Sequence, residues 1–341
     1  MSRASVLRSA VLAASVVLAV TGCSLKSPSS SSDSAADDFP QRAIHLQSVV
    51  PAGSVFDVYA RALADASASC KCFDQPVVVD DLAGSGSPGV VQVLSAANDG
   101  YTMGIASMSH LLAQPVLNPG LPYKNANDYE PVMDAVSVYD SLAVPANSPY
   151  KSIEDLVAAG KANPGKIRYG AGGGLGSLPQ LVMVQLEQAT GAKYTVVPFA
   201  SSALGIAALL GGQIDAIVAT TADLSQHAKA GTMRVLGTFA PERDTGFDNV
   251  PTFKEKGIDV TLSSFYILFA PKGTPAAIVD KLYQGFKKAS ETPTFKAFAD
   301  KSGYKVLDLK DPAATRTMLL ERGQQVEKLL TDLNLAGSAK K

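Results

Sequence analysis

The 341-residue chain has few of the side chains that hold metals or perform covalent chemistry. It contains three cysteines and three histidines, which are Cys23, Cys70, Cys72, His45, His110 and His227. No histidine lies in a metal-spacing motif with a cysteine, which argues against a structural zinc site. The sequence also lacks a Gly-x-Ser-x-Gly elbow, and three scattered histidines supply few catalytic bases. We therefore expect no metal, no cofactor and no enzymatic activity.

An excess of charge of one sign is also missing. The chain has 30 lysines and arginines against 31 aspartates and glutamates, for a net charge of −1. A nucleic-acid-binding protein usually shows a basic surface, and this balance does not predict one. We expect no nucleic-acid partner.

Long apolar runs are confined to the N-terminus. The run from Ala10 to Val20 follows Arg3 and Arg8, is too short to remain as a membrane-spanning helix, and is typical of a signal peptide. Val20-Thr21-Gly22-Cys23 resembles the cleavage box of bacterial lipoproteins. We predict a signal peptide over residues 1–22 and lipidation of Cys23; an ordinary signal peptide that happens to contain a cysteine is the alternative.

The segment after the predicted cleavage site is poor in apolar residues. Ser24 to Asp38 consists largely of Ser, Asp and Ala, which predicts a flexible tether over residues 23–38. Cleavage would remove two basic and no acidic residues, so the mature chain would carry a net charge of about −3. No later stretch is apolar for long enough to cross a bilayer. We expect an extracytoplasmic protein, lipid-anchored to the cell membrane, in either a diderm or a monoderm envelope.

Cys70-Lys71-Cys72 is the remaining cysteine feature. Outside the cytoplasm two thiols this close can be oxidised to a disulfide. A bridge across one residue closes a very small, strained loop, so both the oxidised and the reduced pair stay open. A redox or metal-binding pair is a third interpretation.

Short β-rich runs alternate with helical patterns, which predicts sheets of parallel strands covered by helices. Strands are predicted over residues 44–50, 76–80, 101–106, 141–144, 166–170, 194–198, 213–218 and 233–238, and an apolar run extends from Phe265 to Ala270. Helices are predicted over residues 56–69, 88–97, 178–190, 202–210 and 222–230, and from about residues 152, 275, 293 and 312. A loop-rich stretch is expected from residue 107 to about Asp134. The length favours two lobes, with the chain passing between them more than once.

The loop Pro51-Ala52-Gly53-Ser54-Val55-Phe56-Asp57 joins the first predicted strand to the first predicted helix. Such a loop points free backbone N–H groups and a helix N-terminus at one place, where an anion can be held. In an exported protein, this loop indicates a receptor for a small carboxylate.

Gly84-Ser85-Gly86-Ser87-Pro88-Gly89 fits the G-x-G-x-x-G pattern of dinucleotide-binding proteins. It follows the second predicted strand, however, and no acidic residue ends a strand about 20 positions later. An exported protein is also separated from nicotinamide pools. We therefore expect these glycines to form a tight turn beside the ligand cleft.

The chain from Phe39 to about Leu330 resembles the solute receptors of tripartite tricarboxylate transporters, the Bordetella uptake gene family. The resemblance rests on motifs in a shared order, which are Pro51-Ala52-Gly53 with Asp57, Gln75 to Asp80 with the Gly84–Gly89 loop, Asp99-Gly100-Tyr101-Thr102, Lys151 to Leu156, Asn163 to Ile167, Gly174 to Ser177, Val197-Pro198-Phe199, Leu210 to Asp215, Lys229 to Arg234, Val250-Pro251-Thr252 and Ala270 to Pro275.

The resemblance implies a type II periplasmic-binding-protein fold of α/β class, a two-lobed Venus flytrap in which each lobe is a mostly parallel sheet flanked by helices. Residues 39–137 and 267–341 would form lobe 1, and residues 138–266 lobe 2. The clamp would close on one small organic carboxylate and hand it to membrane permease subunits, and the protein would be a monomer. A binding protein that signals to a membrane sensor instead of a permease is the alternative.

Ligands of such folds sit beyond the carboxyl ends of the strands, where helix N-termini converge. In lobe 1 we expect ligand contacts from Ser54, Val55, Phe56, Asp57, Ser107, Ser109 and His110. In lobe 2 and at the junction we expect them from Gly174, Gly176, Ser177, Ser201, Ser202, Asp223 and Phe265. Asp57 and Asp223 have a second interpretation, as acidic residues that stabilise a helix N-terminus. His110 has one as a structural loop histidine.

Four departures from the family pattern lie in this predicted site. Val55 and Phe56 replace small residues of the first loop, Phe199-Ala200-Ser201-Ser202 replaces a Tyr-Lys-Gly-Gly segment, Gln180 replaces a histidine, and Ser264-Phe265-Tyr266 replaces an aromatic-Gly pattern. These changes leave fewer full charges in the pocket. We expect backbone and hydroxyl donors to supply most of the anion binding.

Overall fold

The computed structural model describes residues 38–50, 52, 54–82, 86–172, 176–243, 247, 249–261, 263–302 and 309–338. The predicted signal peptide, Cys23 and all but the last residue of the tether lie outside this part of the chain, as does Gly174. Within the described part, no helix combines the length and the apolar character needed to cross a membrane.

The first lobe is built on a mixed sheet with the strand order β2-β1-β3-β9-β4. Its strands are β1 (Ile44–Ser48), β2 (Val77–Asp81), β3 (Thr102–Ser107), β9 (Ser263–Pro271) and the first part of β4 (Tyr129–Pro145). β1 pairs in parallel with β2 and β3, whereas β9 runs antiparallel to β3 and β4. Its helices are α2 (Val55–Ser69), α3 (Ser87–Leu94), α4 (Gln114–Leu117), α9 (Ala276–Ser290), α10 (Pro293–Ser302) and α11 (Pro312–Asp332), with a π-helical turn, η1 (Ser109–Ala113).

The second lobe is built on the continuation of β4. Its other strands are β5 (Arg168–Gly172), β6 (Thr195–Phe199), β7 (Ala216–Thr220) and β8 (Met233–Thr238), and its helices are α5 (Ile153–Ala162), α6 (Leu178–Thr190), α7 (Ser202–Leu210), α8 (Thr221–Lys229) and the 3₁₀ turn η2 (Lys254–Lys256). β5 pairs in parallel with β6 and β7, and β4 runs antiparallel to β7 and β8.

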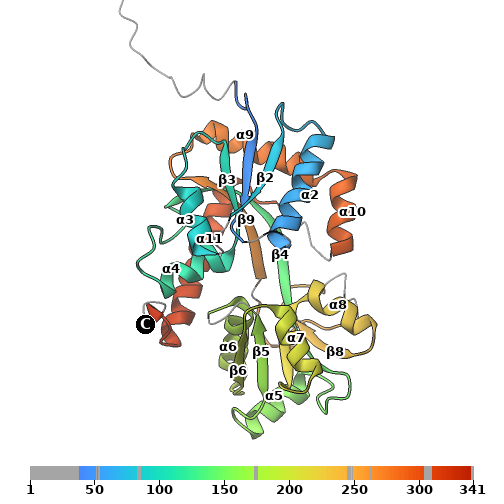
Figure 1. Cartoon of the computed structure of the whole chain (residues 1–341). Coiled ribbons are helices and arrows are strands. Elements are labelled where there is room, and N and C mark those ends of the chain that lie inside the picture. The colour runs from blue at the N-terminus through green and yellow to red at the C-terminus, as the bar shows by residue number, and fades with distance from the viewer. Residues whose placement is uncertain are drawn as a thin grey trace, which may run out of the picture.

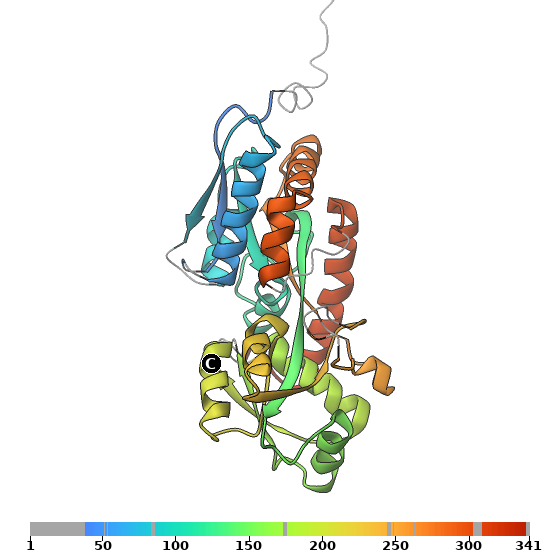
Figure 2. The same ribbon diagram turned by 90° about the vertical axis from the view of Figure 1, so that its right-hand side faces the viewer.

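Two strands connect the lobes. β4 and β9 form an antiparallel pair in the first sheet, with Val136 opposite Tyr266 and Tyr139 opposite Ser263 at the crossing, and β4 alone continues into the second sheet, where it pairs with β7 and β8. Figure 1 shows β9 and β4 side by side between the upper and lower halves, and Figure 2 shows β4, in green, running through both halves. The two-lobed α/β fold predicted from the resemblance is therefore confirmed, although β4 and β9 make both sheets mixed.

Local sequence signals explain where most helices begin. Ser54, Ser152, Ser201, Thr220 and Asp311 are N-cap residues whose side-chain oxygen accepts a hydrogen bond from the backbone N–H three residues later. Such caps satisfy one of the first free N–H groups of a helix and stabilise it by about 1 kcal/mol. Pro115 and Pro312 lie in the first turns of their helices, where the missing N–H costs nothing.

The core consists of apolar side chains between each sheet and its helices. One cluster joins α2, α9 and α10 to the first sheet through fully buried residues such as Leu46, Tyr59, Phe286 and Phe295. A second cluster continues from η1 and α3 of the first lobe into α5 and α6 of the second. The continuous apolar contact holds the lobes against each other on that side.

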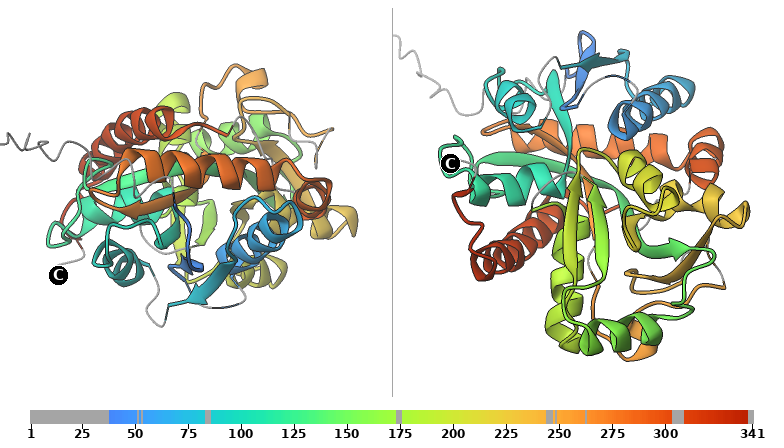
Figure 3. Two further views of the ribbon diagram at one scale, coloured as in Figure 1. Left: turned by 90° about the horizontal axis from the view of Figure 1, so that it is seen from above. Right: turned by 60° about the horizontal axis from the view of Figure 1, so that its bottom comes forward.

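The C-terminal helix α11 contributes to this contact. It contacts η1 and α4 in the first lobe and α6 in the second, and Figure 3 shows it, in red, beside the yellow-green helix of the second lobe. Gly176, just before α6, lies so close that a Cβ atom there would be 2.8 Å from Leu117 Cδ1 and 3.4 Å from Leu330 Cδ2. The loop before α6 is thereby fixed against α4 and α11.

Three sequence predictions are wrong in detail. Residues 129–134 are part of β4 and not of a loop, and residues 109–117 form η1 and α4 within the stretch expected to be irregular. Two of the prolines that suggested a loop fit into regular structure. Pro131 lies at a register shift of β4, where the strand pairing does not require a backbone N–H from this residue. Pro115 lies in the first turn of α4, where the missing N–H costs no helical hydrogen bond. The third error is the expected predominance of parallel pairing.

Cys70 and Cys72 are joined by a disulfide in the structure, with Cα atoms 5.2 Å apart. They follow α2 directly, and Lys71 between them has a positive φ of 49°. The pair lies at the end of α2 opposite to Ser54, so it takes no part in the predicted ligand site.

Candidate ligand-binding site

The first loop of the predicted site ends in a capped helix. Ser54 is the N-cap of α2, and its Oγ accepts a hydrogen bond from the Asp57 N–H at 3.3 Å. The first N–H groups of a helix have no partner within the helix, and the positive end of the helix dipole attracts an anion to them.

Asp57 is held by an arginine of its own helix. Its side chain is 6% exposed, and its Oδ1 lies 2.6 Å from Arg61 Nε. Arg61 Nη2 in turn lies 2.6 Å from Oδ2 of Asp81, the last residue of β2. Asp57 therefore anchors the helix through an ion pair, as well as having the acidic character that a helix N-terminus favours.

Phe56 extends an aromatic cluster at the same end of α2. Its ring centroid is 4.3 Å from that of Tyr266 on β9 and 5.9 Å from that of His110 on η1. Tyr266 lies opposite Ser107 in the β3–β9 register. The structure thus brings together Phe56, Ser107 and His110, three residues that the sequence analysis placed in the site from separate segments.

His110 is a neutral hydrogen-bonding group. Its Nδ1 accepts from the Ser107 backbone N–H at 3.4 Å and lies 3.1 Å from Ser107 Oγ. Burial lowers the pKa of His110 to about 4, so the ring carries no charge at neutral pH. With Nδ1 acting as an acceptor, the single ring proton belongs on Nε2, which becomes a donor.

Gly86 lies against this ring. A Cβ atom on Gly86 would be 3.6 Å from His110 Nε2, and the φ of Gly86 is +76°, in the left-handed region that favours glycine. Gly86, one glycine of the turn considered for dinucleotide binding, is therefore a neighbour of His110, whereas Gly84 and Ser85 lie outside the described residues.

In the second lobe, Ser177 is a buried polar residue at the start of α6. It is the N-cap of α6 but makes no capping hydrogen bond, and its Oγ is buried without a partner among the described residues. The preceding N–H, that of Gly176, donates to Gln180 Oε1 at 2.7 Å. A buried hydroxyl without a partner is uncommon and is satisfied by a ligand or an ordered water in many binding sites.

Ser201 and Ser202 form the start of α7. Ser201 Oγ accepts from the Leu204 N–H at 3.4 Å, and Ser202 packs on the end of β5, where a Cβ on Gly172 would be 2.7 Å from the Ser202 backbone nitrogen. Ser201 is exposed and Ser202 half-buried. The structure gives Ser201 a capping role, and a ligand contact for this pair stays a prediction.

Asp223 lies in the first turn of α8, beside a buried carboxyl group. Thr220 Oγ1 caps that helix by accepting from the Asp223 N–H at 3.1 Å. Thr220 lies opposite Asp140 of β4, whose side chain is buried and whose Oδ2 has no partner among the described residues. Burial, and then the charge of Asp223, raise the pKa of Asp140 to about 7.

The crossing strands link these two groups of residues. Phe265, which we expected at the site, is buried on β9 opposite Ser137 in the first part of the crossing. Val136 lies opposite Tyr266, and Asp140, four positions further along β4, lies opposite Thr220. At a rise of about 3.3 Å per residue, this is a distance of roughly 13 Å, which suits a small molecule held between the lobes.

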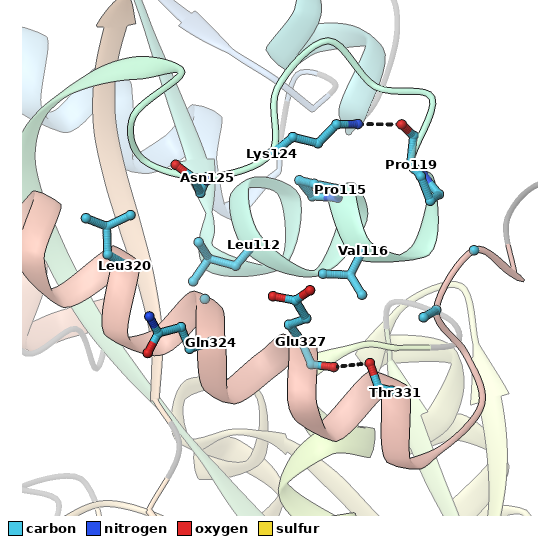
Figure 4. Close-up of a pocket in the computed structure, with 13 residues that line it drawn as sticks. Leu112, Pro115, Val116, Pro119, Lys124, Asn125, Leu320, Gln324, Glu327 and Thr331 are labelled. Carbon is cyan, nitrogen blue, oxygen red and sulfur yellow. Dashed lines mark hydrogen bonds between the residues drawn. The ribbon is translucent and has the colours of Figure 1, made fainter.

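One cavity of the described residues lies apart from the predicted site. A cavity of about 730 Å³ lies between η1, α4 and α11 and is lined by Leu112, Val116, Lys124, Gln324 and Glu327 among others. Figure 4 shows its side chains, with Lys124 Nζ donating to the Pro119 carbonyl and Glu327 on α11. None of the residues expected to contact a ligand lines it. No group of three metal-ligating side chains gathers in the part of the chain that the structure describes.

The sequence analysis missed three residues around the site. Tyr266 was placed only in a segment that departs from the family pattern, and Arg61 and Asp140 were not considered. The spacing of Asp57 and Arg61, four residues apart on a helix, was the available signal for an ion pair. Ser109 lies on η1 next to His110, and Val55 is the first residue of α2.

Comparison with known proteins agrees with this architecture. The family model described as "Tripartite tricarboxylate transporter family receptor" matches residues 59–335. A protein encoded in the gbd 5′ region of Cupriavidus necator is 36% identical over 76% of this chain and 78% of its own, and the protein BugT of Bordetella pertussis is 31% identical over 86% of this chain and 91% of its own.

A solved structure of a solute-binding protein of this family from Polaromonas, without ligand, has a TM-score of 0.73 at 28% identity, and covers 86% of this chain and 99% of its own. A Rhodopseudomonas palustris protein solved with adipate has a TM-score of 0.74 at 24% identity, covers 88% of this chain and 99% of its own, and has the same fold. The chain belongs to the receptor family of the tripartite tricarboxylate transporters, a family of extracytoplasmic solute-binding proteins.

Proposed function

We propose that this protein captures a small organic carboxylate between its lobes and delivers it to a membrane permease of the tripartite tricarboxylate type. The observation that carries the proposal is the position of Ser177. Its buried hydroxyl without a partner follows Gly176, which lies against Leu117 at the end of α4. α4 continues directly from η1, which holds His110. This contact supports the proposal that a donor of each lobe faces the ligand at the boundary between the lobes.

The chemistry of these groups suits an anion. The first turn of α2 offers backbone N–H groups, neutral His110 offers Nε2–H, and Ser107 and Ser177 offer hydroxyls. Such donors bind a carboxylate without placing a full positive charge in the site. We include Ser54, Val55, Phe56, Asp57, Ser109, Gly174, Gly176, Ser201, Ser202, Asp223 and Phe265 in the proposed lining.

The molecule would be organised as a receptor. Lobe 1 would comprise residues 39–137 and 267–341 and lobe 2 residues 138–266, with the mature chain held at the membrane by lipidated Cys23 and the tether up to residue 38. The protein would act as a monomer without a cofactor and without catalysis. A Cys23→Ser variant expressed in a bacterial host should move from the membrane fraction to the soluble extracytoplasmic fraction.

Thermal unfolding tests the proposal. Residues 38–341 would be unfolded with a panel of di- and tricarboxylates, acidic amino acids and aromatic carboxylates. Malate and adipate belong in this panel because solved proteins of this fold hold them. A ligand at 100 times its dissociation constant adds about 2.7 kcal/mol and should raise the midpoint by several degrees.

A clear shift with one class of carboxylate would support the receptor function. No shift across the panel, with the protein folded and free of carried-over ligand, would contradict carboxylate capture. Reconstitution with the permease subunits then separates transport from the alternative, a binding protein that signals to a membrane sensor. Uptake that depends on the receptor would be expected for transport.

A further inference from the structure

Arg61 connects two acidic residues at the edge of the candidate site. It lies on α2 one turn after Asp57 and binds Asp57 Oδ1 through Nε at 2.6 Å, while its Nη2 lies 2.6 Å from Asp81 Oδ2. The three side chains differ in exposure: 6% for Asp57, 25% for Asp81 and 49% for Arg61. The least solvated carboxylate is therefore the one nearest to the first turn of α2.

This arrangement fixes the orientation of the first turn. The guanidinium of arginine is planar and can hold two carboxylates at defined angles, which an ammonium group does less well. One carboxylate belongs to α2 and the other to the end of β2. The ion pairs therefore tie the N-terminal turn of α2, with its free N–H groups, to the sheet.

The same ion pairs reduce the net negative charge beside the first turn of α2. A helix N-terminus attracts anions, but a buried, unpaired carboxylate in its first turn would repel an anionic ligand. Arg61 supplies one positive charge against the two negative charges of Asp57 and Asp81. The pKa of Asp81 is raised by its burial and then by the charge of Asp57, which indicates that the two carboxylates interact.

We propose that Arg61 is a positioning and charge-compensating residue, which holds the first turn of α2 and neutralises Asp57 so that this turn can accept an anionic ligand. The inference rests on the proposed function, because it requires a carboxylate at this turn. It assigns to Arg61 no direct contact with the ligand.

A double-mutant cycle of Arg61→Gln and Asp81→Asn tests the inference. Affinities would be measured by calorimetry on the mature chain, at low and at moderate salt, for the dicarboxylate that stabilises the wild type and for its monoamide. Circular dichroism would establish that each variant is folded. Arg42→Gln is the matched control, because Arg42 pairs with Asp99 at 3.0 Å in the same lobe and away from the site.

Arg61→Gln should weaken the dicarboxylate at least 10-fold and the monoamide less, because it removes the positive charge that lies beside both carboxylates. The loss should shrink as salt screens these charges. Asp81→Asn removes one negative charge, but its amide oxygen can still accept a hydrogen bond from Arg61 and keep the tie to the sheet. Alone it should therefore preserve or raise affinity, and in the Arg61→Gln background it should recover part of the loss. Arg61→Lys, which keeps the charge without the planar fork, should lie between wild type and Arg61→Gln. Arg42→Gln should bind as wild type does.

Two results would overturn the inference while leaving the proposed function intact. The first is wild-type affinity in folded Arg61→Gln. The second is an equal loss of affinity in Arg61→Gln and Asp81→Asn with both ligands, which would show that the residues act without any effect of charge on the ligand. If Arg61→Gln does not fold, a loss of affinity in Asp81→Asn would overturn it. Failure of the wild type to bind any carboxylate would overturn the proposed function and the inference together.

Discussion

Asp140 is a buried residue whose ionisation should change the free energy of unfolding with pH. Its carboxyl group is buried on β4, and burial followed by the charge of Asp223 raises its pKa from 3.8 to about 7. The unfolded chain loses this proton at lower pH than the folded chain, so between these values the folded state binds more protons. The free energy of unfolding should therefore fall as the pH rises from about 4 to about 7, by up to about 4 kcal/mol from this group.

Asp140→Asn should remove this part of the pH dependence and raise stability at pH 7. Urea unfolding between pH 4.5 and pH 8 would measure the effect. Asp65→Asn, at an exposed position of α2, is the control and should leave the profile unchanged. Burial raises the pKa of Asp134 to about 7 as well, so a slope should remain in Asp140→Asn. An unchanged slope in Asp140→Asn would contradict the expectation.

Alanine variants of Ser177 and Ser152 should have opposite effects, because the first should change ligand affinity and the second the free energy of unfolding. Ser177 Oγ has no partner among the described residues, so Ser177→Ala should change the unfolding midpoint little and weaken the ligand at least 10-fold. Ser152 Oγ caps α5 at 3.1 Å and is not among the residues of the proposed site, so Ser152→Ala should cost about 1 kcal/mol of stability without affecting affinity. Calorimetry and urea unfolding on both variants would show the contrast. Full affinity in Ser177→Ala would remove this hydroxyl from the site.

At the scale of elements, two glycines in helices give opposite predictions. Gly323 lies within α11, where an added Cβ would meet only Leu112 Cδ2, at 3.7 Å, so Gly323→Ala should gain up to about 1 kcal/mol from helix propensity. Gly285 lies within α9, where a Cβ would be 2.2 Å from the Phe73 ring, so Gly285→Ala should destabilise by about 1–3 kcal/mol through overpacking. Urea unfolding would measure both. A loss of stability in Gly323→Ala would show that the cavity beside α11 is tighter than the structure indicates.

The elements also show what the sequence could predict. Helices such as α6 and α7 were predicted at their observed bounds, because a serine cap and an apolar periodicity are local signals. β4 was predicted only at its end, because Pro131 interrupts its pattern and the register shift that accommodates a proline depends on the partner strand β9. The antiparallel course of β9 depends on a partner more than 100 residues away, which no local pattern specifies.

The candidate site follows the same division. Ser54 and Asp57 could be placed from the strand–loop–helix pattern, and Ser107 and His110 from their position after β3. The Arg61 bridge to Asp81 and the proximity of Asp140 to α8 depend on how β2 and β4 lie beside those helices. Spatial neighbours of this kind require the tertiary fold, whereas helix caps require only a few consecutive residues.

At the scale of the whole molecule, the paired strands β4 and β9 predict how the lobes move. Apart from these strands, the described contacts between the lobes include those of α11 with α6 and of Gly176 with Leu117 and Leu330. A rotation about the crossing near Val136 and Tyr139 would keep the strand pairing and change the separation of the α2 and α8 N-termini. A ligand that contacts both lobes should favour the closer arrangement.

Small-angle X-ray scattering of the mature chain should therefore give a smaller radius of gyration with the stabilising carboxylate than without it. Ser177→Ala, which loses a predicted contact of the second lobe, should need a higher ligand concentration for the same decrease. Ser152→Ala should behave as the wild type, because its cap lies on α5, away from the crossing. An unchanged radius at a concentration that fully stabilises the wild type would contradict closure, and would mean that the ligand is bound with the lobes already in their final arrangement.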